Sequence, residues 1–109
     1  MPRQLRKGDA FPLDYNALLR APRIEHAVYL FWSKSKACFV YIGKTDRTLP
    51  KRLRDHWLDC HNPTLRAWIL YEPDDLIVCY IACPASVLPK LERRSIRRLD
   101  PIANKDYKV

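Results

Sequence analysis

One acidic residue lies on the apolar face of a helix that is predicted near the C-terminal end of the sequence. The apolar positions of this helix, expected over residues 86–99, are Leu88, Leu91, Ile96 and Leu99. Glu92 lies at the centre of that face instead of among the arginines on the opposite side. A buried carboxylate is costly unless a cation compensates it. We therefore expect Glu92 to bind a metal ion, to form a buried pair with an arginine, or to reach water at the edge of the face.

A cation and an imidazole stand one helical turn apart in the middle of the chain. Arg52 and His56 flank an apolar stripe that Leu49 and Leu53 begin. Side chains four residues apart on a helix are neighbours, so these two can act at the same point. The alternative is a pair of solvated surface residues.

Two tyrosines belong to neighbouring segments that both have strand character. Tyr41 precedes Ile42-Gly43-Lys44 at the end of one segment, and Tyr29 lies in the other. Strand alternation can place both rings on one face of a sheet, although the register is open at this stage. Two core tyrosines are the alternative.

These side chains must be positioned by an alternation of strands and helices. Strands are expected over residues 27–32, 38–42 and 76–83, with Gly43 ending the second. One helix is expected to begin after a Thr48 hydroxyl cap, and a second to run from Asn62-Pro63 to Leu70. A last helix is expected from a Ser86 cap to about Leu99, with Pro101 ending it. The order predicts an α+β fold, a three-stranded antiparallel sheet with helices packed against it. We expect an extension over residues 1–24, with a short helix at 15–20, and one domain over 25–109.

The charge balance favours a polyanionic partner. The 109 residues hold 20 Lys+Arg and 12 Asp+Glu, a formal charge of +8. Phosphate backbones are the commonest such partner, although surface charge also serves solubility. The longest apolar runs are far shorter than the ~20 residues of a membrane span, so we expect a cytoplasmic protein without a membrane partner. The four cysteines are then expected to be thiols, mainly in the core, because Cys79 and Cys83 on one strand would lie ~13 Å apart, too far for one zinc ion.

Together these residues resemble the GIY-YIG nuclease family over residues 26–104. The matching elements are Ala27-Val28-Tyr29, Tyr41-Ile42-Gly43 with Lys44, Arg52-Leu53 with His56, Leu88 with Leu91-Glu92, and Pro101 with Asn104. Each three-letter motif is weak by itself, whereas the ordered set is specific. The one departure is Ala27, where the family usually has glycine.

The resemblance implies a metal-dependent DNA endonuclease that leaves 5′-phosphate and 3′-hydroxyl ends. Glu92 would hold Mg²⁺ or Mn²⁺, and Arg52 would neutralise charge on the phosphate. Tyr29 or Tyr41 would accept a proton from water, which needs cations such as Lys44 and Arg52 to lower its pKa. His56 would relay that proton. By the same resemblance, Asn104 would hold the site together by hydrogen bonds.

Binding of nucleic acid is expected to rest on residues close to the site and on the basic side of the last helix. These are Gly43, Lys44, Lys51, Arg54, Arg93 and Arg97. A chain this short leaves no room for a separate DNA-reading domain, so a homodimer or a partner protein would supply specificity. We expect a bacterial or phage-type origin. Two alternatives stay open: the same chemistry on single-stranded DNA or RNA, and a non-catalytic nucleic-acid-binding module.

Overall fold

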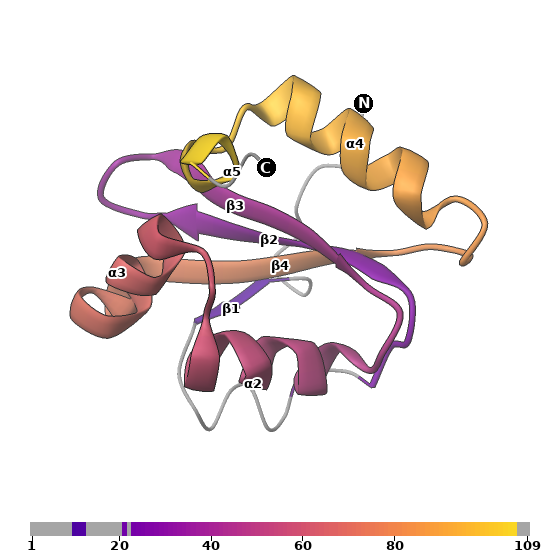
Figure 1. Ribbon diagram of the computed structural model, residues 1–109, viewed down its shortest axis with the longest axis horizontal. Helices are drawn as coiled ribbons and strands as arrows, with labels where there is room; N and C mark the ends of the chain where they lie inside the picture. Colours follow the sequence, from indigo (N-terminus) through magenta and orange to yellow (C-terminus); the bar gives the residue numbers. More distant parts are fainter. Residues whose placement is uncertain (1–9, 13–20, 22, 107–109) are drawn as a thin grey trace.

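Helices pack on both faces of one antiparallel sheet in the computed structural model (Figure 1). The structure describes residues 10–12, 21 and 23–106. The strands are β1 (Ala10–Pro12), β2 (Ala27–Ser33), β3 (Cys38–Thr45) and β4 (Leu76–Ala82), in the order β1-β4-β2-β3. The helices are α2 (Leu49–Asp59), α3 (Pro63–Tyr71), the 3₁₀ turn η2 (Pro73–Asp75), α4 (Leu88–Leu99) and α5 (Ile102–Asp106). The α+β class and the three expected strands are confirmed, and the short strand β1 is an addition, paired with β4.

The hairpin of β2 and β3 sets the geometry of the molecule. Its register places Tyr29 opposite Gly43 and Phe31 opposite Tyr41, with an irregularity after Phe31. β2 lies between β3 and β4, which explains its nearly continuous apolar sequence. β3 is an edge strand, so one side of its backbone is not paired to another strand.

The two faces of the sheet carry different helices. Tyr29, Phe31 and Val40 pack with Leu49 and Leu53 of α2. On the other face, α4 covers a second cluster, whose buried members are Val28, Leu30, Ile42, Cys79 and Leu88. Figure 1 shows α2 and α4 on opposite sides of the sheet. Any site that uses both helices must therefore lie at an edge of the sheet.

Three local expectations are wrong in detail. β3 does not end at Gly43 but continues to Thr45, because Gly43 pairs in register with Tyr29. Thr48 occupies the N-cap of α2 without a side-chain hydrogen bond. α4 begins at Leu88 rather than after a Ser86 cap, because a backbone turn in which the Val87 N–H bonds to the Pro84 carbonyl precedes it. The expected Asn62 cap of α3 is confirmed by its bond from the Leu65 N–H.

The helix α5 was not expected. Asp100 ends α4 in the left-handed conformation with φ 49°, and five residues then turn back onto β3. Such a short helix has no measurable periodicity, and its stability comes from packing of the fully buried Ala103. The expected helix at 15–20 lies outside the described residues, and the division at residues 24 and 25 stays a prediction.

Two further expectations concern thiols and membranes. All four cysteines are thiols outside any disulfide, with Cys60 and Cys79 buried as expected and Cys38 and Cys83 partly exposed. In the described ranges, the helices are too short or too polar to cross a bilayer.

Candidate active site

The buried phenol of Tyr29 is the centre of the site. Its side chain is fully buried, and its ring lies across Gly43 of the neighbouring strand. A Cβ at residue 43 would overlap the Tyr29 hydroxyl and would stand 3.0 Å from its Cε1. Glycine is therefore required at this position to make room for the phenol, which is a physical reason for the Tyr-Ile-Gly motif.

Helix α2 brings Arg52 and His56 to the Tyr29 hydroxyl. Burial of Leu49 and Leu53 fixes the rotation of the helix, and the adjacent stripe then faces β2. Arg52 Nε donates to Tyr29 Oη at 3.2 Å, and His56 Nε2 lies 2.6 Å from the same oxygen. The hydroxyl accepts from Arg52, so we assign its proton to a bond donated to His56 Nε2. Both residues thus act at one atom, as the sequence predicted, and neither is a solvated surface residue.

Burial favours the uncharged forms of the three aromatic side chains of the site, Tyr29, Tyr41 and His56. Burial raises the pKa of Tyr29 well above its usual range, with Tyr41 adding to the rise and Arg52 opposing it. The pKa of Tyr41 is also raised by burial against the effect of Arg52. The pKa of His56 is lowered to about 3, first by burial and then by Arg52 and His61. Arg52 acts in the predicted direction on the tyrosines, but burial outweighs it.

Glu92 approaches the same edge of the sheet from the opposite face. Its carboxylate lies 3.9 Å from Lys44 Nζ, and its side chain is 21% exposed against 45% for Lys44. Burial raises the pKa of Glu92, whereas Lys44, Arg93 and Arg52 lower it. A buried pair with an arginine was one alternative for Glu92, and the ion pair that it makes is instead this long contact with a lysine. The carboxylate is therefore poorly compensated for its burial.

The chemistry of Glu92 fits a hard divalent cation. Within residues 10–12, 21 and 23–106, no group of three or more His, Cys, Asp or Glu side chains could enclose a metal ion. Mg²⁺ needs only one or two protein carboxylates and keeps several waters, so a single half-buried glutamate suits it.

Asn104 fastens α5 to the unpaired edge of β3. Its Nδ2 donates to the Ile42 carbonyl and its Oδ1 accepts from the Ile42 N–H, both at 2.9 Å. The amide thus takes the place of a neighbouring strand between Tyr41 and Gly43. The predicted structural role of Asn104 agrees with this geometry. Asn62, which the sequence indicated only as a helix cap, also donates to the Ala103 carbonyl at 2.9 Å and so anchors α5.

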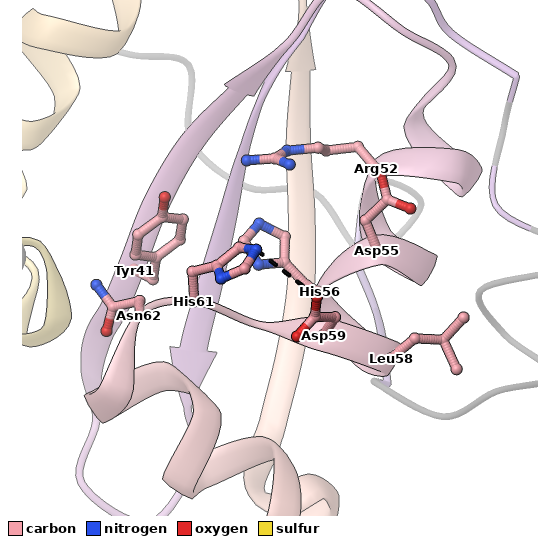
Figure 2. Close-up of a pocket in the computed structure, with 8 residues that line it drawn as sticks. All are labelled: Tyr41, Arg52, Asp55, His56, Leu58, Asp59, His61 and Asn62. Carbon is pink, nitrogen blue, oxygen red and sulfur yellow. Dashed lines mark ion pairs between the residues drawn. The ribbon is translucent and has the colours of Figure 1, made fainter.

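A cavity of about 450 Å³ opens beside these groups (Figure 2). Its lining residues are Tyr41, Arg52, Asp55, His56, Leu58, Asp59, His61 and Asn62. The sequence singled out Tyr41, Arg52 and His56 for this site. It missed the remaining wall, which comes from the last turns of α2 and the connection to α3, because ordinary surface residues carry no local signal of a cavity.

The predicted nucleic-acid contacts divide between the two sides of the sheet. Lys51 and Arg54 are exposed on α2, and Arg93 and Arg97 are exposed on α4. Lys44 is exposed near Glu92, whereas Gly43 is buried under Tyr29. Contact of these residues with nucleic acid stays a prediction.

The comparison with solved structures finds a likeness to one nuclease domain. This is the GIY-YIG N-terminal endonuclease domain of UvrC from Thermotoga maritima, a tyrosine-to-phenylalanine point mutant bound to the catalytic divalent cation. The TM-score is 0.56 at 28% sequence identity, over 82% of this chain and 91% of that chain. No protein-family model and no curated protein matches the chain. The chain is thus a GIY-YIG-like module with the fold of that endonuclease domain.

Proposed function

We propose that this GIY-YIG-like module is a divalent-metal-dependent endonuclease that hydrolyses phosphodiester bonds of DNA, leaving 5′-phosphate and 3′-hydroxyl ends. The observation that carries the proposal is the meeting of Arg52, Tyr29 and His56 at one oxygen beside a cavity, with the poorly compensated Glu92 close enough to raise the pKa of Tyr29. The likeness to an endonuclease domain bound to a divalent cation supports the same chemistry.

Each side chain has a physical task in this proposal. Glu92 would hold Mg²⁺ or Mn²⁺, which supplies Lewis-acid stabilisation of the phosphate charge. Arg52 is half-buried at the cavity and stays charged, so its guanidinium binds the non-bridging phosphate oxygens. Lys44 adds positive charge at the same edge. Asn104 holds the strand that carries Tyr41 and Gly43.

The proton of the attacking water leaves through Tyr29. A neutral phenol can accept a proton from water only if it gives up its own hydroxyl proton to another group. For Tyr29 that acceptor is the neutral His56 Nε2, at 2.6 Å from the hydroxyl oxygen. Arg52 donates to the buried Tyr29 hydroxyl, and a turn of Arg52 toward a bound phosphate would free that oxygen for the water. Tyr41 lines the cavity, where it would position the water, and its side-chain hydrogen bond is with Tyr29 rather than with His56. Tyr29→Phe should therefore reduce cleavage more than Tyr41→Phe, and the reverse order would assign the base to Tyr41.

A plasmid assay tests the proposal as a whole. The protein should nick supercoiled DNA with Mg²⁺ or Mn²⁺ and not with EDTA. Glu92→Ala should abolish cleavage while DNA binding in a filter or anisotropy assay persists, because binding rests on exposed cations. Glu72→Ala, at an exposed position beyond α3, is the matched control and should cut normally. Equal cleavage by the Glu92→Ala variant and the parent would remove the basis of the proposal.

A further inference from the structure

Four residues that line the cavity beside Arg52 have no part in the proposed cleavage step, and we call the part of the cavity that they line its outer end. Asp55, Leu58, Asp59 and His61 line this end (Figure 2). Leu58 is 69% exposed, so its side chain is available to a ligand in the cavity. The outer end therefore combines an apolar contact surface with hydrogen-bond acceptors.

A phosphate group does not suit the outer end. Asp55 and Asp59 lie in the last turns of α2, where the helix dipole adds partial negative charge. Their neighbours compensate them only loosely, since Arg47 lies 3.6 Å from Asp55, and Asp59 has the imidazole of His61, which is positive only when protonated, at 3.7 Å. A strand whose phosphate is held by Arg52 would be repelled if it laid its next phosphate here.

A nucleobase does suit it. A base has flat apolar faces that can stack on the Tyr41 ring, and such stacking is tolerant of base type. Leu58, on the α2 side of the same cavity, offers a further apolar contact. Its exocyclic amino group donates hydrogen bonds, and carboxylates such as Asp59 accept from the amino group of cytosine. The cavity volume of about 450 Å³ lies within the usual range of small-molecule sites.

We infer that the outer end of the cavity holds one unstacked nucleobase of the strand that is cut, next to the phosphate at Arg52. The inference rests on the proposed nuclease function and names its substrate class. Taking a base out of a paired stack costs free energy, and this cost is smallest where the base is already unpaired. The substrate is therefore DNA with an unpaired nucleotide at the cut, and continuous duplex is a poorer one.

Binding measured without cleavage tests this directly. The Glu92→Gln protein in EDTA is titrated with three labelled duplexes of one length: fully paired, with a single bulged cytosine, and with an abasic bulge at the same place. The abasic duplex has the same bend and charge and lacks only the base. We expect about tenfold tighter binding of the cytosine bulge than of the abasic bulge, the scale of one stacked and hydrogen-bonded base.

Variants at the outer end locate the effect. Leu58→Ser and Asp59→Ala should bring the ratio of the two affinities close to one, and because both side chains are exposed the variants should melt like the parent. Asp74→Ala removes the same charge at an exposed site in η2 and should leave the ratio unchanged. Equal affinity for the two bulges, or a ratio unaffected by Leu58→Ser and Asp59→Ala, would overturn the inference. Failure of the parent to cut any DNA would instead count against the proposed function, and the binding ratio would still decide the base site.

Discussion

Replacing Glu92 by glutamine separates a metal ligand from a structural ion pair. Glutamine keeps the shape and a hydrogen-bonding head but has no charge to desolvate. The pair with Lys44 is long and half-exposed, so its loss should cost at most about 1 kcal/mol. Burial raises the pKa of Glu92 more than Lys44, Arg93 and Arg52 together lower it. Removal of the charge should therefore return at least the free energy that is lost with the Lys44 pair. In EDTA near pH 7 the Gln variant should melt at the same temperature as the parent or higher.

The pH dependence of this difference has a definite sign. The folded-state pKa of Glu92 is raised above its ordinary value of 4.5. Protonated Glu92 therefore favours the folded state below that pH, and the contribution is lost as the pH rises through the raised pKa. The Gln variant has no such loss. The difference in Tm between the Gln variant and the parent should grow as the pH is raised from about 4 to 7.

Thermal melts with and without Mn²⁺ provide the measurement. Mn²⁺ should raise the Tm of the parent, because a ligand that binds only the folded state stabilises it, and should leave the Gln variant unchanged. A structural ion pair would behave differently, because its loss costs about 3–5 kcal/mol and lowers the Tm of a domain of this size by more than about 10 °C. A drop of that size in EDTA, together with retained cleavage, would refute the metal-site reasoning.

Three further predictions follow from the site. Gly43→Ala should lower the unfolding free energy by about 1–3 kcal/mol, because the new Cβ overlaps the Tyr29 hydroxyl, and an unchanged Tm would contradict this packing. The pKa of His56 is lowered to about 3, so the neutral imidazole stabilises the folded protein above pH 6.5. That contribution to the free energy of unfolding is lost as the pH falls toward 3. His56→Gln should therefore lose less Tm than the parent between pH 7 and about 4.5, and equal losses would argue against a buried neutral imidazole. Arg97→Ala should reduce the slope of log K against log salt for DNA binding by about 1. Arg66→Ala, at an exposed position on α3, should leave the slope unchanged, and equal slopes for the two variants would remove α4 from the interface.

Much of the scaffold and several residues of the site could be predicted from local patterns. The aromatic and β-branched run at 27–32 indicates β2 because such side chains suit a strand buried on both faces. Glu92 could be identified because helical periodicity places it on an apolar face, and the structure finds it half-buried there. Arg52 and His56 could be paired because four residues make one helical turn.

The convergence of these residues depends on contacts between distant parts of the chain. Tyr29 meets His56 across 27 residues, and Asn104 meets Ile42 across 62. Strand register decided that Tyr29 lies over Gly43, and a one-residue slip would have turned that ring to the other face.

The sequence by itself therefore determined which side chains are candidates for the proposed chemistry and which elements carry them, because spacing along a helix or strand is a local property. The tertiary structure decided that α2 and α4 approach the edge strand β3 from opposite faces. It also decided that α5 forms at all, and that Asp55, Leu58 and Asp59 close a cavity beside Arg52. These features arise from packing of surfaces far apart in the chain, and no local pattern encodes them.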